Sequence, residues 1–122
     1  MTVLSSVVPV LRIFDEPKAR EFYVDFLGFK IDFEHRYGDN FPIYIGISHS
    51  NCVLHLSEHH GDASPGSHVR IETGDVDQLC RALTAKNYRY AKPGRPEGTP
   101  WGTQELTIDD PFGNKLTFVQ QK

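Results

Sequence analysis

Cysteine is scarce in this 122-residue chain, and clusters of positive charge are missing from it. The two cysteines, Cys52 and Cys80, are too few for a disulfide framework, and their apolar neighbours predict reduced, partly buried thiols. No run of Lys or Arg occurs and the formal net charge is −3. Nucleic-acid-binding proteins carry a basic surface, so we expect no nucleic-acid partner.

Long apolar segments are lacking as well. No stretch approaches the ~20 apolar residues of a membrane span, so no membrane partner is expected. Residues 2–6 lack the charged start and apolar run of a secretory signal, and the expected location is therefore the cytoplasm. The sequence also lacks a catalytic triad, a phosphate-binding loop and a glycine-rich dinucleotide motif.

The first half of the chain predicts one helix among four strands. Asp15 precedes a segment with Pro in its first turn and an apolar stripe, and Gly28 follows it, which indicates a capped helix over residues 17–27. Segments rich in β-branched and apolar residues predict the strands. These strands cover residues 7–13, 29–34, 41–47 and 52–57.

The same order of elements begins again after a turn-rich loop, residues 58–67. Asp75 stands where Asp15 stood, before a second amphipathic helix over residues 75–86. A turn-rich insert, residues 93–103, precedes the penultimate strand. The four strands expected in this half cover residues 68–72, 87–92, 104–108 and 115–119.

These two modules, about residues 5–58 and 66–120, lie about 60 residues apart in one domain that spans residues 1–122. We therefore predict an α+β fold of paired βαβββ modules. Each helix covers one face of a four-stranded mixed sheet, which leaves the other face free. Two such curled sheets placed together form a cleft, which is a natural small-molecule site.

Alternation along two of these strands indicates which side chains line the cleft. In strands 52–57 and 68–72 the apolar set suits the helices, so the polar set faces away from them. The histidines of this set are either hydrogen-bonded sheet residues or ligand contacts, and both interpretations are favoured over metal ligation. The residues expected to face the cleft are Val53, His55, Ser57, His68, Arg70 and Glu72.

Trp101 is the only tryptophan, and it lies in a Pro/Gly loop outside any apolar stripe. An aromatic side chain in such a loop offers a flat face for stacking or for cation contacts. A loop that folds back and buries its own aromatic residue is the alternative. The sequence leaves both interpretations open.

Four segments together resemble the glyoxalase/bleomycin-resistance/dioxygenase (vicinal oxygen chelate) superfamily, and most closely its bleomycin-resistance proteins. The resemblance covers essentially the whole chain. The segments are SVVPVL at residues 6–11, EFY followed by LGF at residues 21–29, PWG at residues 100–102 and DPFGN at residues 110–114.

This resemblance implies a small-molecule, antibiotic-binding protein that sequesters its ligand without chemistry. It adds Phe33 and Trp101 as aromatic residues of the ligand groove. Arg70 occupies the approximate position of another expected tryptophan, which favours an anionic or carboxylated ligand. With these implications, the expected ligand-binding residues are Phe33, His55, Ser57, His68, Arg70 and Trp101.

The resemblance also places a metal site of the superfamily at Val8, His55, His68 and Thr117, and two of these residues are not suitable ligands. We therefore expect no metal cofactor. The alternative is a metal-dependent, glyoxalase-like lyase, isomerase or transferase with a degenerate site, in which His55 and His68 hold Zn²⁺ or Ni²⁺. The resemblance further implies a homodimer that exchanges its N-terminal strand near Pro9.

Overall fold

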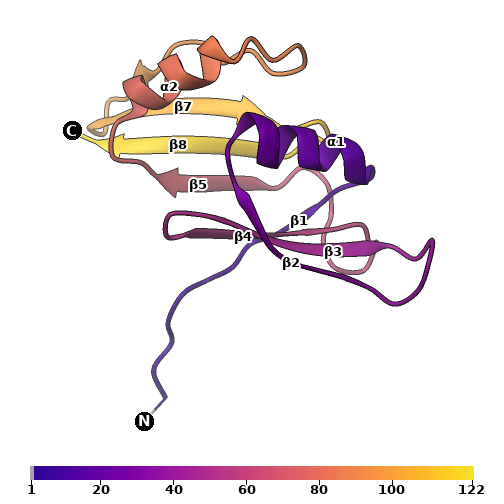
Figure 1. The fold of residues 1–122 in the computed structure, drawn as a ribbon. Helices are drawn as coiled ribbons and strands as arrows, with labels where there is room; N and C mark the ends of the chain where they lie inside the picture. The colour runs from indigo at the N-terminus through magenta and orange to yellow at the C-terminus, as the bar shows by residue number, and fades with distance from the viewer. Residues whose placement is uncertain (1) are drawn as a thin grey trace.

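The first half of the chain forms a four-stranded mixed sheet in the computed structural model, which describes residues 2–122. The order is β1-β4-β3-β2, with β1 parallel to β4 and the other pairs antiparallel (Figure 1). The strands are β1 (Val10–Arg12), β2 (Lys30–Arg36), β3 (Ile43–His49) and β4 (Cys52–Ser57).

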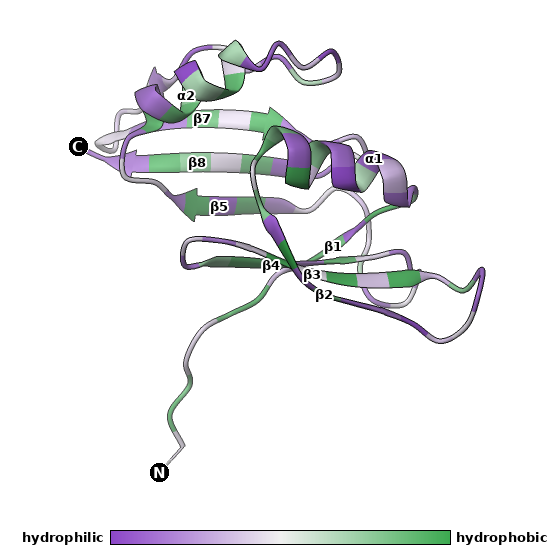
Figure 2. Cartoon of the chain, viewed as in Figure 1, coloured by the Kyte–Doolittle hydropathy of each residue, from purple (hydrophilic) through white to green (hydrophobic). Residues whose placement is uncertain are grey.

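The second half repeats this arrangement in the order β5-β8-β7-β6, with β5 parallel to β8. Its strands are β5 (His68–Glu72), β6 (Glu97–Gly98), β7 (Thr103–Asp109) and β8 (Lys115–Gln121). Hydrophobic and hydrophilic residues alternate along β5, as a half-buried strand requires (Figure 2). The predicted α+β fold with two mixed sheets is confirmed.

Both helical segments begin at an aspartate cap. Asp15 accepts a hydrogen bond from the Lys18 amide at 3.0 Å, and Asp75 accepts one from the Gln78 amide at 3.0 Å. The first segment differs from the predicted helix because α1 (Glu16–Arg20) continues as the π-helix η1 (Glu21–Phe26). The second is α2 (Val76–Ala85). In the described part of the chain, no helix has the length and apolar content needed to cross a membrane.

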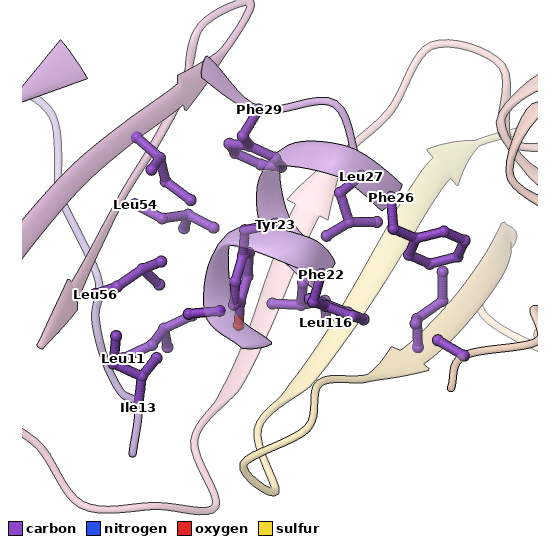
Figure 3. Packing of buried hydrophobic residues seen from close by; sticks show 14 of the residues in the cluster. Leu11, Ile13, Phe22, Tyr23, Phe26, Leu27, Phe29, Leu54, Leu56 and Leu116 are labelled. Atoms are coloured by element: carbon purple, nitrogen blue, oxygen red, sulfur yellow. The ribbon is translucent and has the colours of Figure 1, made fainter. Parts of the chain in front are cut away.

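The helical segment α1–η1 supplies the centre of a core shared by both sheets. Tyr23 is fully buried, and Figure 3 shows its ring between Leu11 and Leu56 of the first sheet and Leu116 of the second. Gly28 follows this segment with a φ of +84°, a conformation that glycine adopts without strain, and turns the chain into β2. The polar faces of both sheets therefore lie away from the core.

The predicted strand over residues 7–13 is wrong at its start. Only β1 pairs with the first sheet, and residues 2–9 extend away from the domain (Figure 1). Proline has no amide hydrogen to donate, and the ladder begins directly after Pro9. The Pro9 carbonyl still accepts a hydrogen bond from the His55 amide at 2.9 Å.

The predicted strand over residues 87–92 is absent from the described chain, and the short strand β6 forms within the insert instead. Asn87 has a φ of +51° and turns the chain after α2. Tyr88 then packs on Phe26 with ring centroids 4.8 Å apart, and its hydroxyl donates to Glu21 at 2.7 Å. This segment contacts the first helical segment rather than a neighbouring strand.

A buried carboxylate connects the two halves. Asp110 Oδ2 accepts hydrogen bonds from the Tyr23 hydroxyl at 2.6 Å and from Asn114 Nδ2 at 2.8 Å, while Oδ1 accepts from the amides of Phe112 and Asn114. Asn114 Nδ2 also donates to the Arg12 carbonyl of β1 at 2.9 Å. Burial, with Asp110 alongside, raises the pKa of Tyr23 well above 10. The tyrosine therefore stays a hydrogen-bond donor.

Replacing Tyr23 with Phe removes this donor and leaves the ring. We expect the free energy of unfolding to fall by about 1.5–3 kcal/mol, because a buried carboxylate loses a partner. Urea denaturation at a fixed protein concentration measures the change. Tyr37→Phe is the matched control, since Tyr37 is 75% exposed, and it should change stability by less than about 0.5 kcal/mol. Equal losses in the two variants would contradict the role given to Tyr23.

Candidate functional site

The first sheet presents three aromatic side chains on its polar face. Phe33 and His55 lie with ring centroids 5.2 Å apart, and the Tyr44 hydroxyl is 2.7 Å from His55 Nδ1. Gly46 makes this arrangement possible, because a Cβ atom there would lie only 2.1 Å from the Phe33 ring. Gly46 is also the register partner of both Phe33 and His55. The three strands therefore place Phe33 directly beside His55.

Ser57 follows on the same face but is fully buried. Its hydroxyl donates to Asp62 Oδ2 at 2.7 Å and accepts the His59 amide at 3.0 Å. The loop after β4 thus folds back over Ser57 and holds Asp62 at the margin of the aromatic group. Burial, together with the Asp62 charge, raises the pKa of Tyr44.

The second sheet carries a chain of hydroxyl groups that begins at a histidine. His68 Nε2 lies 2.7 Å from Thr117 Oγ1, which lies 2.9 Å from Thr107 Oγ1. Thr107 and Thr117 are register partners on β7 and β8, and Arg70 is paired with Thr117 from β5. This row crosses the polar face of the sheet.

Beside this row, Glu105 of β7 connects two of the predicted residues. Its carboxylate accepts hydrogen bonds from Arg70 Nη2 at 2.7 Å and from Trp101 Nε1 at 3.4 Å. Thr103 Oγ1 adds a third donor at 2.7 Å. Trp101 nevertheless stays 67% exposed, so its loop does not bury the indole.

The predicted residues therefore form two groups, one on each sheet. Phe33 and His55 lie together on the first sheet, with Ser57 buried nearby under its loop. Arg70 and Trp101 meet at Glu105 on the second sheet. Within residues 2–122, no hydrogen bond, ion pair or aromatic contact joins one group to the other.

A hollow of about 660 Å³ lies between the two modules, where β5 ends and β4 begins. Its wall includes Val53 and Leu54 from β4 and Ile71 from β5, while Val7 and Pro9 of the N-terminal arm, residues 2–9, line one side. Arg70 is the only one of the predicted ligand-binding residues in this wall. The hollow is thus largely separate from the two side-chain groups.

Comparison with models of protein families shows the family to which the chain belongs. The family model described as "Glyoxalase superfamily protein" matches residues 2–122. The chain belongs to the glyoxalase superfamily. No curated protein matches the sequence significantly.

Several solved structures share the fold over all or nearly all of the chain. A bleomycin-binding protein from the bleomycin-producing Streptomyces verticillus, solved with copper(II)-bleomycin, is 29% identical over 100% of both chains, with a TM-score of 0.75. TnmS3, an antibiotic binding protein from Streptomyces sp. CB03234, is 23% identical over 100% of both chains, with a TM-score of 0.77. A glyoxalase/bleomycin resistance protein/dioxygenase superfamily member from Sphaerobacter thermophilus DSM 20745 is 24% identical over 97% of this chain and 98% of its own, with a TM-score of 0.72.

The side chains at the superfamily's metal positions do not fit a divalent metal centre. Val8 has no donor atom, and Thr117 gives its hydroxyl to hydrogen bonds with His68 and Thr107. His55 lies on the other sheet and contacts Tyr44. Among the described residues, no three side chains of His, Cys, Asp or Glu are grouped so that they could hold a metal ion.

Sequence reasoning missed Tyr44 and Glu105, which hold the predicted residues in place. Alternation places Tyr44 on the face of β3 shared with Gly46, but only the strand register brings its hydroxyl to His55. Glu105 is 35 residues from Arg70 in sequence, and no local pattern links them. Its position four residues after Trp101 was the only available signal.

The hydrogen bonds of Arg70 and Thr103 lower the pKa of Glu105 from its ordinary value of 4.5 to about 2. A glutamate with a depressed pKa stabilises the fold above its ordinary pKa, and this contribution is lost as the pH falls toward 2. In a ¹³C NMR titration the Glu105 carboxyl should therefore stay ionised at pH 3. Arg70→Gln should move its midpoint toward 4.5.

Arg81→Gln on α2 is the control for this titration. The Arg81 side chain makes no hydrogen bond or ion pair within the described part of the chain. The same change in net charge should therefore leave the titration midpoint of Glu105 unchanged. A Glu105 midpoint near 4.5 in the unmodified protein would contradict the ion pair with Arg70.

Proposed function

We propose that this protein is a small-molecule binding protein of the antibiotic-binding type, which sequesters a flat ligand without breaking a bond. The observation that carries the proposal is the exposed indole of Trp101, which is hydrogen-bonded to Glu105 on a polar sheet face. A flat aromatic ring that is both exposed and held in place suits stacking on a heteroaromatic group. Bleomycin-binding and antibiotic-binding structures with the same fold support this ligand class.

The first sheet supplies the second half of the proposed site. Phe33 is 44% exposed, and His55 lies beside it with its Nδ1 at the Tyr44 hydroxyl. His55 Nε2 is then available to a ligand. His68 and Arg70 provide polar contacts on the second sheet, while Ser57 acts indirectly by holding Asp62. The two free cysteines suit a reducing compartment such as the cytoplasm.

The side-chain groups of the first and second sheets can contact one ligand if two chains combine. We therefore propose a homodimer that exchanges its N-terminal arm. β1 and β5 are edge strands with unpaired backbone groups, which favour pairing with another strand. The arm exposes Leu4 and Val7, 90% and 86% accessible, to solvent. Residues 2–8 can span about 23 Å when extended. The hollow at the end of β5 offers apolar contacts to an arm from a second copy.

Isothermal titration of metal-free bleomycin into the metal-free protein tests ligand binding. We expect saturable binding near one ligand per chain. Trp101→Ala should weaken it at least 5-fold, because stacking on an aromatic side chain contributes about 1–3 kcal/mol. Tyr90→Ala is the control, since Tyr90 is an exposed aromatic outside the site.

A different result would favour the enzyme alternative. If the drug does not bind but Zn²⁺ binds tightly, and His55→Ala abolishes Zn²⁺ binding, the sequestration proposal is wrong. Unchanged drug affinity in Trp101→Ala would contradict the site, because the proposal depends on this side chain.

Sedimentation equilibrium tests the exchanged arm. Val7→Asp places a charge in the proposed interface, so we expect the dimer dissociation constant to rise at least 10-fold. Phe41→Asp adds the same charge at an exposed apolar residue of the β2–β3 loop and should leave the dimer unchanged. A monomeric unmodified protein, or equal effects of the two substitutions, would contradict the exchange.

A further inference from the structure

A single carboxylate on the second sheet holds side chains from three segments of the chain. Glu105 accepts hydrogen bonds from both terminal nitrogens of Arg70 on β5, at 2.7 and 3.3 Å. It also accepts hydrogen bonds from Trp101 Nε1 in the loop before β7 and from Thr103 Oγ1 on β7 itself. A two-pronged contact between a guanidinium and a carboxylate is strong and directional, so it fixes both partners.

We propose that Glu105 is the specificity-determining residue of this face, which directs the site toward flat, uncharged ligand groups and against anions. The inference rests on the proposed function, because it concerns the ligand that the Trp101 face accepts. Glu105 does this in two ways. It holds the Trp101 indole in place through a hydrogen bond, and it forms an ion pair with Arg70, the only arginine on this face of β5.

The positioning role follows from how few contacts Trp101 makes. Its side chain is mostly exposed, and Gly102 follows it with a φ of +92° in a tight turn. Within residues 2–122, the bond to Glu105 is the only side-chain hydrogen bond of Trp101, and its ring stacks on no other aromatic ring. Without the Glu105 carboxylate the indole has no polar anchor.

The selection against anions follows from the pairing of the two charges. Glu105 engages both terminal nitrogens of Arg70, and the Glu105 side chain is 14% exposed whereas that of Arg70 is 49% exposed. An anionic ligand on this face meets the Glu105 carboxylate beside Arg70, and displacing that carboxylate breaks two charge-assisted hydrogen bonds. Together the two side chains carry no net charge. A neutral aromatic group meets no like charge and breaks no ion pair.

Three naphthalene probes of one shape and different charge test the proposal: naphthalene-2-carboxamide, naphthalene-2-carboxylate and (2-naphthylmethyl)ammonium. The chemical shift of the Trp101 indole N–H reports their binding. We expect the unmodified protein to bind the carboxamide at least 5-fold more tightly than the carboxylate. In Glu105→Gln that preference should reverse, because Arg70 becomes available to the carboxylate. In Arg70→Gln the affinity for the ammonium probe should rise at least 5-fold.

The positioning role has its own measurement in the absence of any ligand. Trp101 is the only tryptophan, so time-resolved fluorescence anisotropy reports its motion alone. Glu105→Ala should increase the fast component of its decay, because alanine leaves no acceptor for the indole N–H. Glu97→Ala is the matched control, since Glu97 is the register partner of Glu105 on β6 and its substitution removes the same charge. It should change neither the anisotropy nor the order of the probes.

The outcomes separate this inference from the proposed function. If the unmodified protein binds no probe and no bleomycin, the proposed function fails together with the selectivity, whereas the anisotropy still decides whether Glu105 positions Trp101. If probes bind but Glu105→Gln keeps the carboxamide preference, the specificity role is wrong. Unchanged anisotropy in Glu105→Ala overturns the positioning role.

Discussion

The arrangement of the two halves depends on one buried carboxylate. Asp110 directly follows β7 and accepts four hydrogen bonds, one of which comes from Tyr23 in the first helical segment. Asn114 extends the network to the carbonyl of Arg12 in β1. A buried charge is tolerated only when it is fully hydrogen-bonded, and these donors come from the first helical segment and from the turn between β7 and β8. The hairpin of the second sheet therefore holds the helix and first strand of the other half.

Much of this fold could be read from the sequence, because strand alternation and helix caps are local signals. Asp15 and Asp75 cap their helices as expected, and β4 and β5 have the predicted bounds. The errors occurred where tertiary contacts decide. Residues 87–92 are rich in strand-forming tyrosine, but Tyr88 packs on the first helical segment instead of entering a sheet.

The candidate site was predictable in composition and not in its connections. Alternation placed His68 and Arg70 on one face of β5, and the structure shows both exposed there. The partners of these residues depend on strand register, which no single segment encodes. Arg70 is consequently paired with Glu105 rather than free, so an anionic ligand no longer follows from Arg70 alone. Ser57 shares the face of His55, yet a loop contact removes it from solvent.

Gly46 gives the first sheet its aromatic surface by having no side chain. The Phe33 ring occupies the volume that a methyl group would fill, so the position of the ring is encoded on a different strand from the ring itself. Even alanine at this position would push the ring off the sheet, without changing any residue that a ligand touches. A position on β3 that contributes no side chain therefore sets the shape of the surface that β2 and β4 present.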